Sequence, residues 1–227
     1  MRRIEGKPVL IFFSMVGLSF LNLLIVYNFI ISNFSLIKES EVLTLLFLLA
    51  IFVLSMIILY RLLFLFFPLP IGQIKEHSLE ETLIMTYQLI IMFIIKPIFQ
   101  NRFIPVPMTR LIYKILGSKV GYGTYFSGTI SDPLHFQIGK NSILGDECLV
   151  ISHAIEGSNF SFYPVLIGDN VTIGAKSIVM AGVQIENGAI IAAGSIVTKH
   201  THIKSGEVWG GIPAKKIKQN LMHHSAS

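Results

Sequence analysis

Two histidines and several carboxylates that could do chemistry together lie between residues 132 and 156. His153 is the side chain there best suited to move a proton, because the pKa of an imidazole lies near neutrality. Beside a substrate hydroxyl, such a ring acts as a general base and makes the oxygen nucleophilic. His135 lies 18 residues earlier and is a second candidate for the same site. It either orients His153, contacts a substrate, or is simply exposed.

A general-base histidine needs a partner, commonly a carboxylate, that holds its ring in one orientation. The candidates are Asp132, Asp146 and Glu156. Asp132 and Asp146 are the nearest to His153 in the repeat described below, and Glu156 is the next in sequence. Asp146 also fits an ordinary corner position, since Asp169 falls at the same point of the repeat. The predicted catalytic set is His153, Asp146 and His135.

The elements that must position these residues follow a six-residue period. Aliphatic side chains recur at Ile138, Leu144 and Val150, and again at Ile167, Ile173, Val179, Ile185, Ile191 and Val197. A fixed short period over nine repeats predicts a solenoid. Three six-residue steps make one triangular coil, with the aliphatic side chains stacked inside and the coils about 4.8 Å apart.

Small residues follow the same period. A small or β-branched residue stands four positions after each aliphatic residue. A glycine or alanine often stands directly after the aliphatic residue itself. We expect the glycines to permit the corner dihedrals. Cys148, the single cysteine, falls on the small-residue position, so it is predicted to pack rather than to act as a nucleophile. A single cysteine also excludes an intrachain disulfide.

The period is interrupted at two places. Val120 and Phe126 keep it, but Asp132 occupies the next aliphatic position, so the first coil is predicted to be irregular. Between Val150 and Ile167 there are 17 positions where 12 would keep the phase. About five extra residues are therefore expected to leave the coil within residues 156–164, directly after His153. Loops that leave a scaffold commonly carry function.

The N-terminal half is of another kind, and it raises the mean hydropathy of the chain to +0.68. Pro8–Ser32 and Val42–Tyr60 carry no charge. At about 1.5 Å per residue, 25 helical residues exceed the roughly 30 Å of a bilayer core. We predict a transmembrane helical hairpin within residues 1–68. The alternative, a cleaved signal peptide, has an apolar run of only about 7–15 residues and a small-residue cleavage site.

Two shorter helices are predicted in the linker, residues 69–117. Thr82–Ile95 is apolar but marginal for spanning, so it is expected to lie at the interface or to be re-entrant. Ser78-Leu-Glu-Glu81 before it has the form of a capping box. Met108–Leu116 is amphipathic and ends at Gly117.

The charges that flank the apolar runs predict the topology. Arg2, Arg3 and Lys7 precede the first run and Arg61 follows the second, whereas the link between them has only Lys38. The positive-inside rule then places both termini and the catalytic part in the cytoplasm. The net charge of +5 is spread out, and no basic run with interleaved aromatic residues predicts a nucleic-acid partner.

The text from Val165 to Lys218, VLIGDNVTIGAKSIVMAGVQIENGAIIAAGSIVTKHTHIKSGEVWGGIPAKKIK, resembles the closing coils of the left-handed β-helix (hexapeptide-repeat) acyltransferases. The likeness is to galactoside, maltose, serine and xenobiotic acetyltransferases and includes the terminal G-x-P-A-K element. The segment from Pro68 to Gly121 resembles a membrane-associated subgroup. The resemblance implies a left-handed parallel β-helix over residues 118–203, a C-terminal tail over 204–227, and a homotrimer with active sites between adjacent subunits.

The same resemblance implies the donor and the residues that bind it. The donor is acetyl-CoA or another acyl-CoA, and no metal is expected. Backbone groups at Gly174, Ala175, Ala192 and Ala193 would line the pantetheine arm, followed by Thr198 and Lys199. Lys215 and Lys218 match basic residues that contact the CoA phosphates. For these lysines, a solvated tail or attraction to anionic lipid is the alternative.

Three functions are open. The first is an O-acetyltransferase at the cytoplasmic face of a membrane, which acetylates a hydroxyl of a sugar or lipid-linked acceptor, with N-transfer chemically possible. The second is a non-catalytic trimeric scaffold. The third is an enzyme like the γ-carbonic anhydrases, whose zinc is held by three histidines, two of them five residues apart. No histidine follows His153 at that spacing, and His200, His202, His223 and His224 do not form a convincing metal site.

Overall fold

The computed structural model describes residues 5–33, 40–97 and 104–219. It divides into two compact units. The helical unit comprises residues 2–69 and 77–96, and the β-helix unit comprises residues 70–76 and 97–227. Five residues that entered the sequence argument, Arg2, Arg3, Lys38, His223 and His224, lie outside the described residues.

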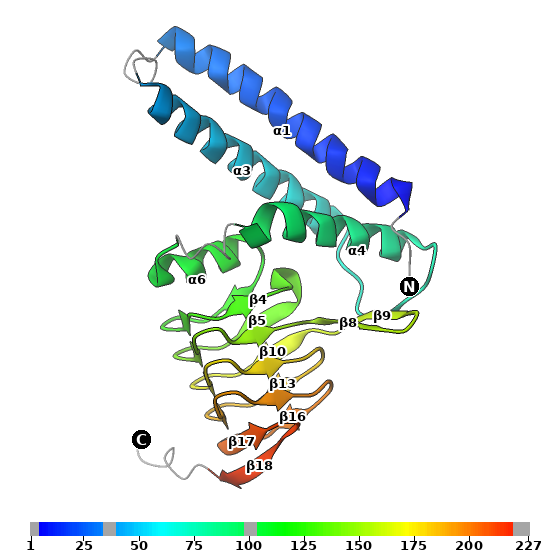
Figure 1. Ribbon diagram of the computed structural model, residues 1–227, viewed down its shortest axis with the longest axis vertical. Helices are drawn as coiled ribbons and strands as arrows, with labels where there is room; N and C mark the ends of the chain where they lie inside the picture. The colour runs from blue at the N-terminus through cyan, green and yellow to red at the C-terminus, as the bar shows by residue number, and fades with distance from the viewer. Residues whose placement is uncertain (1–4, 34–39, 98–103, 220–227) are drawn as a thin grey trace. The chain divides into compact units, whose positions relative to one another are not determined.

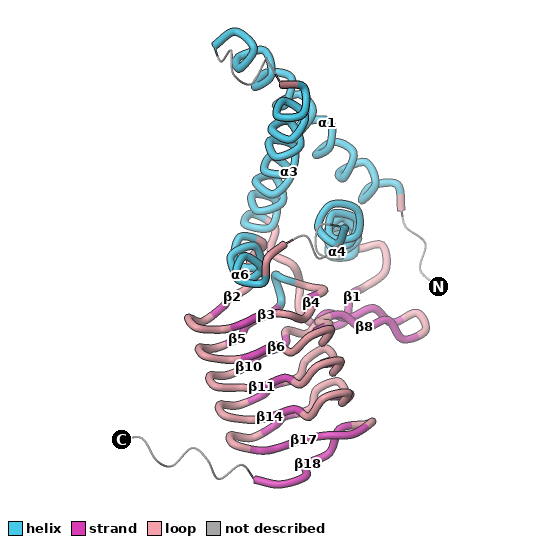
Figure 2. Tube along the Cα trace, turned by 60° about the vertical axis from the view of Figure 1, so that its left-hand side comes forward, coloured by secondary structure: helices cyan, strands magenta, loops and turns pink. Residues whose placement is uncertain are grey.

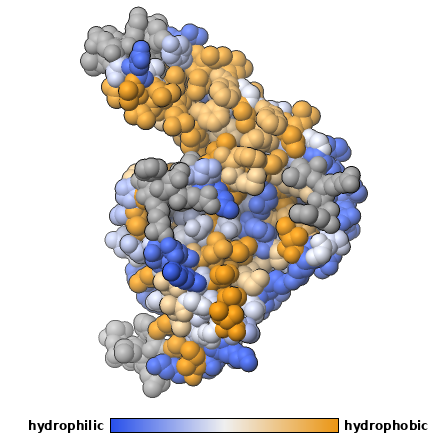
Figure 3. All heavy atoms as spheres, in the orientation of Figure 1, coloured by the Kyte–Doolittle hydropathy of each residue, from blue (hydrophilic) through white to orange (hydrophobic). Residues whose placement is uncertain are grey.

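The helical unit holds α1 (Gly6–Asn33), α3 (Glu41–Phe66) and α4 (Leu79–Ile90), which continues as the π-helical turn η1 (Ile91–Ile95). Stretches of α1 and α3 are long and apolar enough to cross a membrane, judged by length and composition alone. Their large apolar side chains are mostly exposed, as the hydropathy colouring in Figure 3 shows. An apolar surface of this kind indicates a lipid or protein partner.

Helix α4 begins where the sequence predicted it. The hydroxyl of Ser78 accepts a hydrogen bond from the backbone N–H of Glu81 at 3.1 Å, which is the forward half of a capping box. The carboxylate of Glu81 accepts a hydrogen bond from the backbone N–H of His77. Tyr87 of α4 stacks on Tyr60 of α3 at 6.2 Å between ring centroids, so the two helices share an aromatic core.

The β-helix unit consists of stacked triangular coils with three parallel faces (Figures 1 and 2). Face 1 contains β2 (Lys119–Val120), β5 (Phe136–Ile138), β10 (Val165–Ile167), β13 (Gln184–Ile185) and β16 (His202–Ile203). Face 2 contains β3 (Tyr125–Phe126), β6 (Ile143–Leu144), β11 (Thr172–Ile173), β14 (Ile190–Ile191) and β17 (Glu207–Gly211). Face 3 contains β4 (Thr129–Ile130), β7 (Leu149–Val150), β12 (Ile178–Val179) and β15 (Ile196–Val197). The antiparallel strand β18 (Ala214–Gln219) closes face 2.

All nine predicted aliphatic residues point inward and are buried, so the six-residue period is confirmed. The role expected for the glycines was wrong at Gly174. Its φ is not in the left-handed region. A Cβ added there would lie 2.4 Å from the backbone nitrogen of Ala193 in the next coil. The glycine is therefore required by the close approach of stacked coils rather than by a corner dihedral.

The irregular first coil was predicted, but its form was not. Ile130, not the residue at position 132, fills the inward position on face 3, where it pairs with Val150. Asp132 follows in the corner, before the short 3₁₀ helix η2 (Pro133–His135). A buried carboxylate cannot replace an aliphatic side chain in an apolar stack, so the strand shifts by two residues.

Helix α6 (Val106–Ile115) covers the open end of this first coil. The ring of Tyr113 packs on Phe126 at 5.7 Å, and its hydroxyl accepts a hydrogen bond from the backbone N–H of Ile130. A solenoid needs such a cap because its terminal coil has no neighbour on one side. Gly117 ends the segment with φ +110°, as predicted.

The extrusion after face 3 is longer than expected. Ile138 and Ile167 pair with an offset of 29 residues, whereas Ile167 and Ile185 pair with an offset of 18. Eleven residues therefore leave the coil rather than about five, because Ile167 is the next inward residue after Val150. They form an antiparallel hairpin of β8 (His153–Glu156) and β9 (Asn159–Phe162). A third strand, β1 (Gly72–Ile74), pairs with β9.

Candidate active site

His153 begins the projecting hairpin, at the corner between faces 3 and 1. Its Nδ1 lies 2.7 Å from Oδ2 of Asp132. The Asp132 side chain is fully buried, whereas 26% of the His153 side chain is exposed. The pair therefore joins a buried anion to a ring that still reaches the surface.

The buried carboxylate has several donors. Oδ2 of Asp132 also accepts the backbone N–H of Ser152 at 2.8 Å. Because an ionised carboxylate only accepts, the Nδ1–H of His153 is the donor in their hydrogen bond. The neutral ring then carries its free lone pair on Nε2, which is the form that a general base needs.

His135 lies close by, although not by the predicted spacing. Ile130 and Val150 pair with an offset of 20 residues, so His135 is not one regular coil away from His153. Its backbone carbonyl accepts from the hydroxyl of Ser152. The rings of His135 and His153 flank Phe162, at 5.4 and 5.6 Å between centroids.

His135 is buried, so the possibility that it is simply exposed was wrong. Burial lowers the pKa of its ring, an effect that the negative charge of Asp132 and a hydrogen bond to the Pro70 carbonyl oppose. Nδ1 of His135 is buried and has no hydrogen-bond partner among the described residues. A neutral, buried ring fits the orienting role or a substrate contact better than it fits proton transfer to solvent.

The structure pairs His153 with Asp132 and not with the predicted Asp146. Asp146 lies at the corner between faces 2 and 3, where it accepts a hydrogen bond from the hydroxyl of Ser127. The reason is the two-residue shift of the first coil, which brings Asp132 beside Ser152. Glu156, the third candidate, forms an ion pair with Lys199 at 2.5 Å.

The four predicted pantetheine positions lie together at the corner between faces 2 and 3. The backbone N–H of Gly174 donates to the carbonyl of Ile191, and the N–H of Ala192 donates to Trp209, so Gly174-Ala175 and Ala192-Ala193 form successive steps of one column. Small side chains leave the backbone of this column accessible. Ala175 and Ala193 are both exposed.

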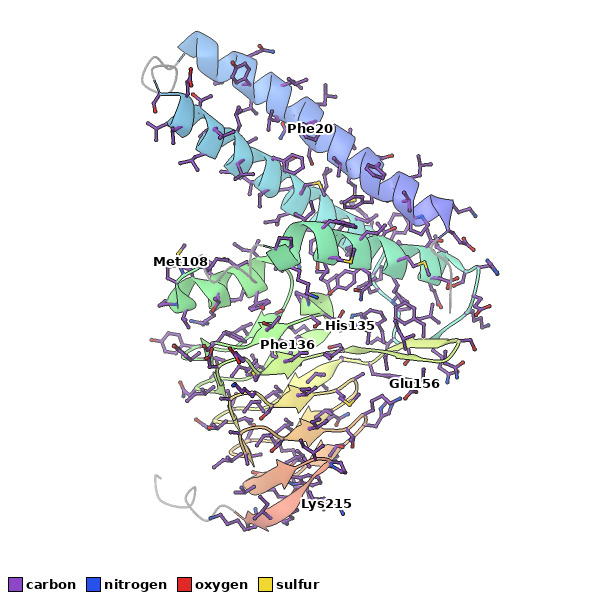
Figure 4. The ribbon with its side chains drawn as sticks, in the orientation of Figure 1. Phe20, Met108, His135, Phe136, Glu156 and Lys215 are labelled. Carbon is purple, nitrogen blue, oxygen red and sulfur yellow. The ribbon has the colours of Figure 1, made fainter. Side chains whose placement is uncertain are left out.

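Lys215 and Lys218 belong to β18, at the C-terminal end of the coils. Lys215 pairs with Gly210, and a Cβ added at Gly210 would lie 3.1 Å from Cβ of Ala192, so Lys215 lies near the column. Thr198 and Lys199 lie elsewhere, at the corner that holds His153. The predicted donor residues are therefore split between two corners. Figure 4 labels Lys215 far along the coils from Glu156 of the hairpin.

Cys148 is buried, and burial raises the pKa of its thiol to about 12. This agrees with a packing residue. His202 pairs with Glu186 at 2.8 Å, and the ring of His200 lies edge-on to Tyr163 at 4.5 Å. In the described part of the β-helix unit, no three histidine, cysteine or carboxylate side chains come together as metal ligands. The candidate group in the described chain, Glu5, His77 and Glu81, lies in the helical unit.

Sequence reasoning missed Phe162 and the segment that contributes β1. Phe162 falls inside the extrusion, where no period exists to place it. Gly72–Ile74 has no signal of its own, because three residues are too few for an alternating pattern. Both are defined only by the pairing of distant segments.

Comparison with known proteins identifies the repeats. Residues 164–199 match the family model described as "hexapeptide repeat of succinyl-transferase". The chain is 30% identical over 166 residues to γ-carbonic anhydrase 2 of Arabidopsis thaliana mitochondria, which covers 63% of this chain and 58% of that protein. This chain spans about half the length of the two Arabidopsis γ-carbonic anhydrases that it matches.

The putative acetyltransferase YvoF of Bacillus subtilis is 32% identical over 117 residues, which cover 49% of this chain and 67% of YvoF. Among solved structures, a galactoside acetyltransferase in complex with coenzyme A aligns with a TM-score of 0.46 and 18% identity, over 65% of this chain and 86% of that one. The likeness to YvoF covers two thirds of that protein. The chain belongs to the hexapeptide-repeat acyltransferase family.

Proposed function

We propose that the protein is an acyl-CoA-dependent O-acetyltransferase in which His153 is the general base. The observation that carries the proposal is the hydrogen bond between His153 and the fully buried Asp132 at the root of the extruded hairpin. An oriented imidazole that is partly exposed suits the abstraction of a proton from an acceptor hydroxyl.

The reaction follows from this geometry. Nε2 of His153 takes the proton of the acceptor hydroxyl while the oxygen attacks the carbonyl carbon of the thioester. The tetrahedral intermediate then collapses, the C–S bond breaks, and the imidazolium returns the proton to the thiolate of CoA. Asp132 stabilises the imidazolium that forms in between, as carboxylates do in catalytic triads. The products are the acetyl ester and free CoA thiol.

The donor would bind along the column of Gly174, Ala175, Ala192 and Ala193, where small side chains expose the backbone to a narrow pantetheine arm. Lys215 and Lys218 would meet the phosphates as point charges. CoA is present in the galactoside acetyltransferase complex, which supports this class of donor.

A homotrimer with sites between neighbouring chains explains why the candidate residues of one chain lie at two corners. His153 of one chain would face the column of its neighbour, as the family resemblance implies. Two inactive variants test this arrangement: His153→Ala, and Ala193→Trp, which fills the column. Mixed and reassembled together, they should recover about a quarter of the sites, because each intact site needs one unmodified corner from each of two chains. A mixture as inactive as its components contradicts the shared site.

We infer that α1 and α3 anchor the enzyme in a membrane, with the β-helix unit in the cytoplasm, where acyl-CoA is made available. Their length and exposed apolar side chains support the anchor. An acceptor at the membrane, such as a lipid-linked sugar, fits this location, and α4 and α6 would then lie near the interface.

The test of the function is acetyl transfer by the full chain in detergent, with acetyl-CoA and a panel of sugars as acceptors and release of the CoA thiol as the readout. Loss of the base in His153→Ala should lower kcat by about 10²- to 10⁴-fold. His200→Ala removes a histidine from the same corner two coils away and should be nearly neutral. Undiminished turnover in His153→Ala contradicts the proposal. If the purified chain binds no acetyl-CoA, the non-catalytic trimeric scaffold is the better assignment.

The similarity to γ-carbonic anhydrase 2 supports a second candidate, a zinc-dependent hydration of CO₂. Within the described β-helix unit of one chain, no three ligands converge, so zinc there would need ligands from more than one chain. Purified protein with stoichiometric zinc and CO₂ hydration activity would favour this candidate over acetyl transfer.

A further inference from the structure

Strand β1 comes from an unexpected place in the chain. It lies in sequence between α3, which ends at Phe66, and α4, which begins at Leu79, yet residues 70–76 pack with the β-helix unit. A connection between two helices therefore supplies the third strand of the sheet that contains His153.

Polar side-chain contacts join the hairpin to the coils, among them the His153–Asp132 hydrogen bond and the Glu156–Lys199 ion pair. Strands β8 and β9 have four residues each and project from the coils (Figure 1). Two-stranded hairpins are only marginally stable in water, and a third strand with an apolar face is normally needed. Strand β1 pairs antiparallel with β9 in the register Gly72 to Phe162, Gln73 to Ser161 and Ile74 to Phe160.

The pairing fixes an apolar cluster under the candidate base. Ile74 and Phe160 are buried opposite each other, and Phe160 packs edge-on against Phe162 at 5.5 Å. Phe162 is completely buried, and its ring contacts the rings of both His135 and His153. Just before β1, the backbone carbonyl of Pro70 accepts a hydrogen bond from the ring of His135.

We propose that the 70–74 segment is a brace that positions His153, with Phe162 as the positioning residue that transmits its effect. The brace holds the hairpin against the coils, and the ring of Phe162 contacts the His153 ring, whose Nδ1 is hydrogen-bonded to Asp132. The proposal rests on the proposed function, because its catalytic consequence requires His153 to be the base. In the chain, the brace follows directly after α3, one of the two candidate membrane helices.

The first experiment isolates the brace with a matched pair of variants in the full chain. Ile74→Ala removes a buried side chain, whereas Ile71→Ala removes the same side chain three residues away, where it is 67% exposed. Amide hydrogen exchange of residues 153–162 should become at least tenfold faster in Ile74→Ala and stay unchanged in Ile71→Ala. Exchange in the coils at residues 167–197 should be unchanged in both. Equal protection of the hairpin in both variants overturns the brace.

The second experiment tests Phe162 by a readout that an unspecific loss of stability would not produce. In Phe162→Ala, water gains access to His135, so the pKa of its ring should rise, as followed by NMR of ring-labelled histidine. Phe162→Leu keeps an apolar side chain and should retain the lowered pKa of His135. Asp132 and Pro70 remain in both variants, so the comparison varies only the ring at position 162.

Activity completes the test. Phe162→Ala and Ile74→Ala should lower kcat about tenfold or more and leave the KM for acetyl-CoA unchanged, because the predicted pantetheine column lies at another corner. Phe162→Leu should recover most of kcat. A rise in KM alone overturns the positioning role. If His153→Ala is fully active while Ile74→Ala still loosens the hairpin, the base assignment fails but the brace as a structural element stands.

Discussion

Two corners of the same β-helix differ in what the repeat does to them. At the corner between faces 2 and 3, the three steps that follow the first coil are short and regular, and glycine and alanine let successive coils approach closely. At the corner between faces 3 and 1, the first step is shifted by two residues and the next is enlarged by eleven. The regular corner offers accessible backbone, whereas the irregular corner offers a buried carboxylate hydrogen-bonded to a partly exposed histidine.

The regular steps repeat one backbone arrangement, whereas the departures from the period bring together residues that the period alone would keep apart. Asp132 and Asp146 are both aspartates near corners, but only Asp132 is buried against a histidine. Burial of an ionised carboxylate costs free energy unless donors surround it, and here Ser152 and His153 provide them. At this corner the buried carboxylate is paired with a partly exposed histidine, and this pairing makes the corner the candidate site.

The largest effect should separate the two aspartates. Asp132→Asn removes the charge that stabilises the His153 imidazolium, and kcat for acetyl transfer should fall by about 10²-fold or more. Asp146→Asn changes the same atoms at the other corner and should leave kcat within about twofold. Steady-state kinetics with saturating acetyl-CoA measure both, and equal losses would remove the distinction between the corners.

A smaller effect should appear in donor binding at the regular corner. Ala193→Glu places a bulky anion on the pantetheine column and should raise the KM for acetyl-CoA by about tenfold with little change in kcat, since it removes binding common to ground and transition states. Gln184→Glu adds the same charge on face 1 and serves as the control. An unchanged KM in Ala193→Glu would mean that the donor does not use this corner.

The lysines of β18 should contribute a few-fold effect. The Lys215→Ala, Lys218→Ala double variant should raise the KM for acetyl-CoA about threefold to tenfold at low salt, and less at high salt, because exposed charges are screened. Lys216→Ala is the matched control, because Lys216 is bound to the buried Glu207 at 2.7 Å. Lys216→Ala should lower the melting temperature and leave the KM for acetyl-CoA unchanged. A rise in KM that is the same at low and at high salt contradicts a phosphate contact.

The smallest effect concerns pH and His135. Its folded pKa is lowered by burial from the ordinary value of 6.5, so the unfolded chain binds the proton first as the pH falls. The contribution of the neutral His135 ring to the free energy of unfolding is complete above about pH 6.5. This contribution is lost as the pH falls below that value, by at most about 1.4 kcal/mol per unit of pKa shift. His135→Gln should flatten the fall in melting temperature between pH 7.5 and 5.5. A steeper fall in the variant would reverse the sign.

Much of the β-helix could be predicted, because its period repeats in local sequence. The inward residues from Ile138 to Val197, the packing role of Cys148 and the helix caps at Ser78 and Gly117 follow from residue type and spacing alone. The partner of His153 could not be predicted in the same way. It depends on a two-residue shift that becomes favourable only when Ile130 can enter the stack opposite Val150.

By itself, the sequence determined the family fold, the two apolar helices and the place where the coil opens, since each is a property of a short, continuous pattern. The tertiary structure alone decided that Asp132 rather than Asp146 holds His153, that the donor candidates occupy two corners, and that residues 70–74 join the hairpin. Those outcomes depend on the free energy of burying particular groups together. That free energy depends on contacts between residues far apart in the chain, so a local sequence pattern cannot predict it.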